Sequence, residues 1–241
     1  MGEHCELMVK EWGITREVQD EIALRSHMNA HAASEDGRLP AMIAPFASHH
    51  SDPLIRPDTT LAKLAALQPV FDRTASGTIT AGSSSPLTDG AASVALMSES
   101  RAERDGIEPL AFIKGIEFAS ISPGDGLLMA PGVAVPRLLR RLGMLLSDMD
   151  VVEMHEAFAG QIACNLAAWS RGWKESAIGE VPVEKLNPMG SSIALGHPFA
   201  ATGVRIVATL AAHMQSTGAR HGLVSVCGAG ATAGAVVLER S

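Results

Sequence analysis

Three short segments of the chain combine reactive side chains with glycines. His155-Glu156-Ala157-Phe158 follows a short apolar run, His197 stands in Gly196-His197-Pro198, and Cys227 runs into Gly228-Ala229-Gly230. An imidazole with a pKa near neutrality is a natural general base. A thiol serves as a proton donor or a nucleophile, and the backbone N–H groups of a glycine turn can bind an oxyanion. Together these residue types indicate proton transfer beside a polarised carbonyl group.

Each segment also has a purely structural interpretation. His155 and Glu156 can orient a water or a carbonyl oxygen, or Glu156 can simply complement the N-terminus of the following helix. A zinc helix is improbable, because Ala159 stands where the second histidine of such a motif belongs. His197 can be a packed loop histidine, and Cys227 can be a small buried hydrophobe before a hairpin.

Glycines after Cys227 resemble the start of a dinucleotide fingerprint. That fingerprint needs a helix after the loop, whereas the strand-like run 235–239 follows and the chain ends at residue 241. The sequence therefore argues against a dinucleotide-binding unit.

The elements that must position these segments alternate between strand and helix over residues 109–241. Predicted strands cover 110–119, 151–154, 222–227 and 234–239, and predicted helices cover 135–142, 156–169 and 201–214. This alternation predicts a layered α/β domain. Open α/β sheets build their sites in loops at strand ends, where all three segments lie.

The first half of the chain is less regular. Residues 3–35 predict one helix or two, with Thr15 as an N-cap and Gly37 as a stop signal. Residues 36–90 carry repeated prolines and a Ser/Thr-rich stretch, which indicates loop-rich chain. Residues 90–103 predict an alanine-rich helix.

Composition narrows the function classes. The chain has 241 residues, 46% hydrophobic and 19% charged, which is typical of a globular protein. A net charge of -7, 4% aromatic residues and no tyrosine argue against nucleic acid as a partner. Three scattered cysteines form no disulfide framework, which favours a reducing compartment.

Location follows from the same observations. The N-terminus lacks a secretory pattern, and no apolar run approaches the roughly 18 residues of a membrane span. We expect a cytoplasmic protein, or a mitochondrial one if the source is eukaryotic, although no transit peptide is seen.

The three segments, in this order, resemble the thiolase family, and the resemblance covers nearly the whole chain. Thiolases carry an Asn- or His-Glu-Ala-Phe segment, a Gly-His-Pro segment and a cysteine with glycines near the C-terminus. Residues 78–92 resemble the segment that joins the family's loop domain to its core, and residues 1–38 resemble the start of that domain. His155 and residues 199–203 are most similar to the 3-ketoacyl-CoA thiolases of fatty-acid-oxidation complexes.

The resemblance implies a thiolase-like layered α/β fold, with a mixed sheet covered by helices after a loop-rich domain. It divides the chain into a loop domain at 1–88, a connecting helix of the N-terminal core at 89–108 and a C-terminal domain at 109–241. It also predicts that the family's N-terminal half is absent.

The implied reaction is thiolysis of a 3-ketoacyl-CoA by CoA, giving acetyl-CoA and a shortened acyl-CoA, or the reverse Claisen condensation. In such a reaction His197 would be the base that activates the attacking cysteine. Cys227 would be the acid/base for the leaving carbanion or the CoA thiol. His155, supported by Glu156, would position an oxyanion-hole water.

Further residues are implied as binding groups. The backbone at Ala229 and Gly230 would supply the second oxyanion donor, Ser85 would contact the CoA pantetheine, and Phe199 would line the substrate site. The resemblance implies no metal and no cofactor, with coenzyme A as a substrate.

The attacking cysteine of the family has no counterpart here. Cys5 lies in a charged amphipathic helix and Cys164 at a packing position in the predicted helix 156–169. The chain is thus expected to be inactive alone, to expose apolar surface and to pair with a thiolase N-terminal half in cis or in trans. A homo-oligomer or a fatty-acid-oxidation complex is the expected assembly.

The sequence also departs from the thiolase pattern at three single positions. Ser191, Ala231 and Ala233 stand where the family usually has glycine, so their turns would be strained if φ is positive there. Three hypotheses remain: an acyltransferase of the thiolase type, a non-catalytic CoA-binding or assembly module derived from one, and an unrelated Cys/His hydrolase using Cys227 and His197. The sequence leaves the reaction direction and the acyl chain length open.

Overall fold

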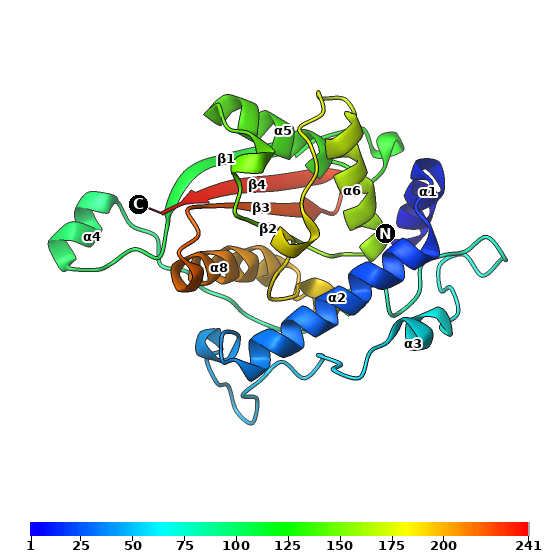
Figure 1. Cartoon of the computed structure of the whole chain (residues 1–241), viewed down its shortest axis with the longest axis horizontal. Helices are drawn as coiled ribbons and strands as arrows, with labels where there is room; N and C mark the ends of the chain where they lie inside the picture. The colour runs from blue at the N-terminus through cyan, green and yellow to red at the C-terminus, as the bar shows by residue number, and fades with distance from the viewer. Residues whose placement is uncertain (241) are drawn as a thin grey trace.

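A four-stranded mixed sheet forms the centre of the computed structural model, which describes residues 1–240 (Figure 1). Its strands are β1 (Phe112–Ser120), β2 (Val151–Met154), β3 (His221–Gly228) and β4 (Thr232–Glu239). They lie in the order β1-β4-β3-β2, with β4 antiparallel to both neighbours and β2 parallel to β3. The predicted strands are confirmed with shifts of one or two residues at their ends.

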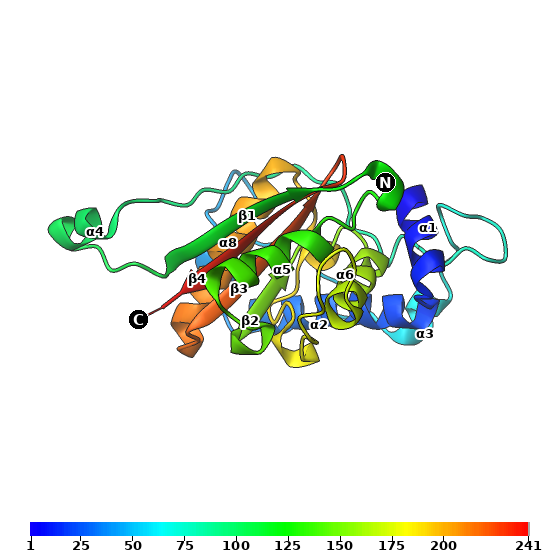
Figure 2. The ribbon, with the colours of Figure 1, turned by 90° about the horizontal axis from the view of Figure 1, so that it is seen from above.

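Helices cover both faces of this sheet (Figure 2). The helix α5 (Pro131–Leu142) packs across β1 and β4, and α8 (Ala200–Thr217) packs against β2 and β3. Neighbouring strand residues point to opposite faces, so Leu223 joins the core under α5 while Val224 joins the core under α8. The predicted layered α/β architecture is confirmed.

The N-terminal helices buttress the side of the sheet that carries the reactive segments. Helix α1 (Gly2–Trp12) packs on α6 (Ala159–Arg171), and α2 (Arg16–Glu35) packs on α6 and on the short α7 (Ser192–Leu195). The expectation for residues 3–35 is confirmed as two helices, and the Thr15 side chain accepts a hydrogen bond at the start of α2. Helix α2 ends at Glu35, just before Gly37.

Residues 36–90 are mostly loop, as predicted, and residues 91–98 also lack a helix. They hold only the 3₁₀ turn Pro40–Met42 and the short helix α3 (Leu61–Ala65). Further 3₁₀ turns lie at Pro123–Asp125, Leu146–Asp148 and Val183–Lys185. The boundaries that separate a loop domain at 1–88 from the segments 89–108 and 109–241 stay a prediction.

The predicted helix over residues 90–103 is wrong in its first half. Helix α4 covers only Glu99–Asp105, with the Ser98 side chain as its N-cap and Gly106 as its left-handed stop. Residues 90–98 run extended and exposed, and they hold α4 away from the body (Figure 1). Alanine content did not produce a helix there, because a short helix that packs on nothing is marginal in water.

No helix among residues 1–240 is both long and apolar enough to cross a membrane.

Candidate active site

The first reactive segment turns the chain from β2 into α6. The backbone N–H of His155 donates to the Ser225 carbonyl on β3 at 2.9 Å, which anchors the corner to the sheet. The His155 side chain is buried, and its Nδ1 lies 2.7 Å from the Ser192 hydroxyl on α7.

The second segment connects α7 to α8. Gly196 has φ +89°, and a Cβ there would lie 2.7 Å from the Thr88 side chain, so glycine is required for the close approach of two loops. The backbone N–H of His197 donates to the Pro86 carbonyl at 2.9 Å. Its Nδ1 lies 2.8 Å from the Thr202 hydroxyl in the first turn of α8.

These two loops bring both imidazoles together. The His155 and His197 rings have centroids 4.3 Å apart and an interplanar angle of 38°. Burial, His197 and Arg205 lower the pKa of His155 to about 3, and burial followed by Arg205 lowers the pKa of His197. Both imidazoles are therefore neutral at pH 7, which is the form in which His197 can accept a proton.

Glu156 does not complement the N-terminus of α6, so that structural interpretation is wrong. Its carboxylate accepts from the Ser26 hydroxyl at 2.6 Å, the Asn187 amide at 2.7 Å and the Ile193 N–H at 3.2 Å. Burial raises the pKa of Glu156, and these three hydrogen bonds oppose that rise. The side chain thus fastens the His155 corner to α2 and α7 rather than facing a ligand.

Cys227 lies at the end of β3 and is buried. It packs in one apolar cluster with Phe158 from the first segment, and with the other two cysteines, Cys5 and Cys164. Burial raises the pKa of the Cys227 thiol to about 12. The thiol is therefore protonated at neutral pH, which suits a proton donor better than a nucleophile.

The turn after Cys227 exposes the two residues whose backbone N–H groups are predicted to bind an oxyanion. Ala229 and Gly230 are exposed between β3 and β4, whereas Ala231 is buried with φ +60°. The positive φ on which the predicted strain depends is present at Ala231 and absent at Ala233, which lies in ordinary strand geometry in β4. Ser191 needs no positive φ either, since its φ is −146°.

Ser85 and Phe199 flank the histidine pair from different loops. Ser85 lies beside the first segment, where its backbone N–H donates to the Ala157 carbonyl at 3.0 Å and its hydroxyl to the same oxygen at 3.1 Å. The Phe199 ring lies 5.2 Å from the His197 ring and is 64% exposed. Its φ of +42° is rare for a residue with a side chain, and such strain collects at functional sites.

Sequence reasoning did not find the polar groups behind the two histidines. Ser26, Asn187 and Ser192 are buried and Arg205 is partly buried, and each forms a hydrogen bond within the network around His155 and Glu156. Apart from the asparagine and serines on either side of Gly190, no local pattern marks them. They come together only through packing of α2, α7 and α8.

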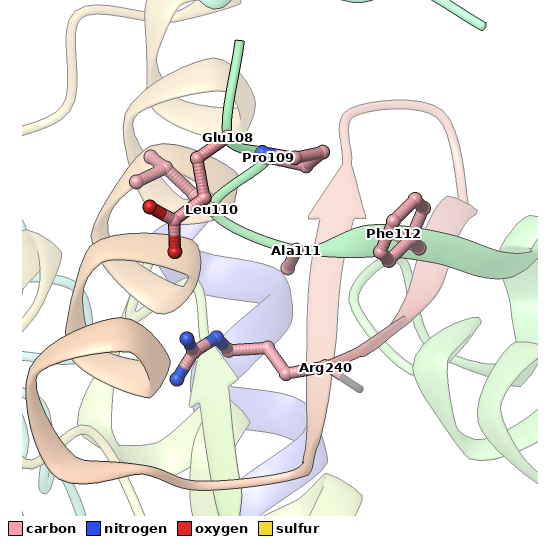
Figure 3. A pocket seen from close by; sticks show the side chains of 6 residues that line it. All are labelled: Glu108, Pro109, Leu110, Ala111, Phe112 and Arg240. Atoms are coloured by element: carbon pink, nitrogen blue, oxygen red, sulfur yellow. The ribbon is translucent and has the colours of Figure 1, made fainter. Parts of the chain in front are cut away.

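Another hollow in the structure lies away from this site. A cavity of about 120 Å³ opens where β1 begins and β4 ends (Figure 3). Its lining consists of Glu108, Pro109, Leu110, Ala111, Phe112 and Arg240. It includes none of the reactive residues, and Arg240 donates instead to the Met214 carbonyl near the end of α8. Among residues 1–240, no group of three or more His, Cys, Asp or Glu side chains is placed to hold a metal ion.

Comparison with known proteins places this geometry in a family. The model of the thiolase C-terminal domain matches residues 107–240, and the model of the thiolase N-terminal domain matches residues 1–100. The chain belongs to the thiolase family, as the resemblance predicted.

Individual relatives agree with that assignment. The chain is 43% identical to a 3-ketoacyl-CoA thiolase of Klebsiella pneumoniae (strain 342) and 42% identical to one of Serratia proteamaculans (strain 568); each match covers 99% of this chain and 58% of the relative. The crystal structure of the Bacillus anthracis acetyl-CoA acetyltransferase superposes with a TM-score of 0.89 at 36% identity, covering 99% of this chain and 59% of that one.

One expectation is overturned. The N-terminal half of the family is not absent, because the N-terminal domain model matches residues 1–100. The absence of one cysteine motif does not imply the absence of the domain, because the loop-rich residues 36–90 carry few recognisable motifs. The chain nevertheless spans under two thirds of the length of these relatives.

Proposed function

We propose that this chain supplies the proton-transfer half of a thiolase active site. The observation that carries this proposal is the pair of neutral imidazoles of His155 and His197, whose ring centroids lie 4.3 Å apart. The substrate is a 3-ketoacyl-CoA with CoA, or the acyl-CoA pair of the reverse condensation, and no metal or resident cofactor takes part.

His197 is the general base of the proposed reaction. With Nδ1–H donating to the Thr202 hydroxyl, its Nε2 lone pair takes the proton of an attacking cysteine thiol. That thiolate adds to the keto carbon and forms a thioester when the carbon–carbon bond breaks. His197 returns its proton when the cysteine thiolate leaves in the second half of the reaction.

Cys227 is the acid of the first half. Its buried thiol gives a proton to the carbanion that becomes acetyl-CoA, and the resulting thiolate then takes the proton of the incoming CoA thiol. The raised pKa of Cys227 makes the thiolate a strong base, so it is reprotonated at once. The N–H groups at Ala229 and Gly230 bind the thioester oxygen, and Ser85 and Phe199 border the CoA and acyl groups.

The attacking thiol comes from polypeptide outside these 241 residues, in cis or in trans. Among residues 1–240 all three cysteines are buried, and none stands at an exposed turn between a strand and a helix. Exposed apolar side chains on β1, with Phe118 at 77% and Ile116 at 43%, offer a face for such polypeptide. The expected homo-oligomer, the fatty-acid-oxidation complex and the cytoplasmic location stay predictions.

A reconstituted thiolysis assay tests this function. The chain is combined with a thiolase polypeptide that supplies the attacking cysteine, and acetoacetyl-CoA consumption is followed with CoA present. His197→Ala is expected to lower turnover by about 10²–10⁴-fold, the usual contribution of a general base. His31→Ala, on the outer part of α2, is the control and should leave turnover unchanged.

Two results would overturn the proposed function. Thiolysis that persists after His197→Ala removes the role of that imidazole. CoA binding measured by calorimetry without any turnover, even in the reconstituted mixture, would instead show a non-catalytic CoA-binding module.

A further inference from the structure

The guanidinium group of a partly buried arginine stands behind the His155 ring. Arg205 lies on α8, and its Nη2 donates to the Ser192 hydroxyl oxygen at 3.1 Å. Its Nε and Nη1 are also buried and have no hydrogen-bond partner among residues 1–240. The acidic side chains that interact electrostatically with this guanidinium are Glu153, Glu156 and Asp52. Removing a cation from water costs free energy, which nearby acidic groups and hydrogen bonds must offset. The one hydrogen bond that Arg205 donates to a side chain therefore indicates a specific role for that contact.

The direction of the hydrogen bonds in this chain of groups is fixed by chemistry. A guanidinium only donates, so the Ser192 oxygen must accept from Arg205. The Ser192 hydroxyl hydrogen then has one acceptor among the described residues, the Nδ1 of His155 at 2.7 Å. If Nδ1 carried a proton instead, the serine hydrogen would be buried without an acceptor, which is unfavourable.

From this geometry we infer that Arg205 and Ser192 hold His155 in the tautomer that carries its proton on Nε2. His155 therefore presents a fixed N–H donor rather than a lone pair. For the proposed acyl transfer, on which this role rests, that donor points its hydrogen at the oxyanion or its bound water and cannot compete with His197 for protons. Arg205 and Ser192 are positioning residues, because they act through the ring.

No comparable pair of residues among residues 1–240 fixes the tautomer of His197. Its Nδ1 partner, the Thr202 hydroxyl, makes no other hydrogen bond among residues 1–240, so it can donate or accept. The two neighbouring rings thus differ: His155 is confined to one tautomer, while His197 is free to lose and gain a proton at Nε2. This asymmetry separates an oxyanion donor from a base within one pair of neighbouring rings.

Nitrogen chemical shifts of ¹⁵N-histidine-labelled protein test the inference directly. The 241-residue chain is labelled, and the His155 signals are assigned by their loss in His155→Gln. The wild type is expected to show a protonated Nε2 and an unprotonated Nδ1, unchanged between pH 6 and pH 8 because the pKa of His155 is about 3. A protonated Nδ1 in the wild type would overturn the inference.

Ser192→Ala provides the matching variant. Loss of one hydrogen bond is expected to reduce the preference for the Nε2–H tautomer by roughly tenfold. Ser191→Ala is the control, since the hydroxyl of Ser191 donates to the Met154 carbonyl and touches neither ring. An unchanged tautomer ratio in folded Ser192→Ala would contradict the inference.

These spectra need neither CoA nor turnover. If the thiolysis assay fails but the spectra show the expected tautomer, the proposed function is overturned and this inference stands. If thiolysis succeeds but the spectra show a protonated Nδ1, this inference is overturned and the proposed function stands.

Discussion

Buried polar side chains carry most of the chemistry at the scale of single residues. His155, Glu156 and Cys227 are all buried, and burial is the largest influence on their pKa values. Neutral imidazoles and a protonated thiol follow from that environment without any unusual residue. His197 and Cys227 thus start in the protonation states that their proposed roles in proton transfer need.

A buried acid outside the proposed reaction, Glu153, makes the stability of the protein depend on pH. It lies in β2, fully buried, and neither carboxylate oxygen has a hydrogen-bond partner among residues 1–240. Burial raises the pKa of Glu153 to about 8, although Arg205 opposes the shift. The folded protein therefore keeps this proton between about pH 4.5 and pH 8, while the unfolded chain loses it.

Because the unfolded state binds fewer protons in that window, this group makes stability fall as pH rises from 4.5 towards 8. Glu153→Gln is expected to remove that loss, and to exceed the wild type by several kcal/mol near pH 8. The free energy of unfolding is measured by urea denaturation, followed by circular dichroism, at several pH values. Glu103→Gln, on the exposed helix α4, should show the same dependence of stability on pH as the wild type. The expectation would be contradicted if the stability of Glu153→Gln changed with pH in parallel with that of the wild type.

A second residue-scale prediction concerns the turn after Cys227. Ala231 and Ala233 are both buried alanines, but only Ala231 has a positive φ, at +60°. Changing either to glycine removes the same methyl group, so the difference between the variants reports backbone strain. Ala231→Gly is expected to be more stable than Ala233→Gly by about 1–2 kcal/mol. Equal free energies of unfolding would show that the turn is unstrained.

At the scale of elements, the site depends on how closely α2 approaches α7. Gly190 has φ +70°, and a Cβ there would lie 2.4 Å from the Ser26 carbonyl oxygen on α2. Ser26 also donates to Glu156, so the same helix that fills the gap holds the His155 corner. Any residue larger than glycine must push α2 away from the site.

Gly190→Ala is therefore expected to destabilise the chain by roughly 2–4 kcal/mol, through strain at positive φ and a backbone collision. Gly203→Ala is the matched control: it lies inside α8, where an added Cβ meets nothing within 4 Å. That change should stabilise the helix by about 1 kcal/mol. Thermal unfolding measures both, and a tolerated Gly190→Ala would mean that α2 can move without cost.

Taken as a whole, the molecule has a packed body and one poorly supported extension. Residues 90–98 are extended and exposed, with Leu96 at 71%, and they separate α4 from the sheet (Figures 1 and 2). The neighbouring segment 83–88 is held firmly, since the Ser83 carbonyl accepts from Ala159 and the Pro86 carbonyl accepts from His197. The extension therefore leaves the body directly beside the site.

Limited proteolysis should find this extension first. Elastase needs an extended backbone next to small side chains, which the run Ala91–Ala95 offers without backbone hydrogen bonds. The two fragments are expected to elute together, because α1 and α2 pack on α6 and α7. The exposed turn 44–50 is an internal control, since Phe46 and His49 close it with two hydrogen bonds. An earlier cut there would contradict the expectation.

Local sequence signals were enough for the strands, for most helices and for the three reactive segments. Alternating apolar residues, the Thr15 cap and the glycine stop at Gly143 act over a few neighbours, so they can be recognised along the chain. The same signals failed at residues 90–98, because an alanine-rich run becomes a helix only when another surface packs against it.

The arrangement behind the site depends on contacts between residues far apart in the chain. Ser26 meets Glu156 across 130 positions, and Ser192 stands between His155 and Arg205 only because α7 and α8 fold over the end of β2. Residue types and spacing alone therefore identify the reactive histidines and the cysteine. Their protonation states and the direction of their hydrogen bonds arise only in the folded chain, because burial and long-range neighbours set them.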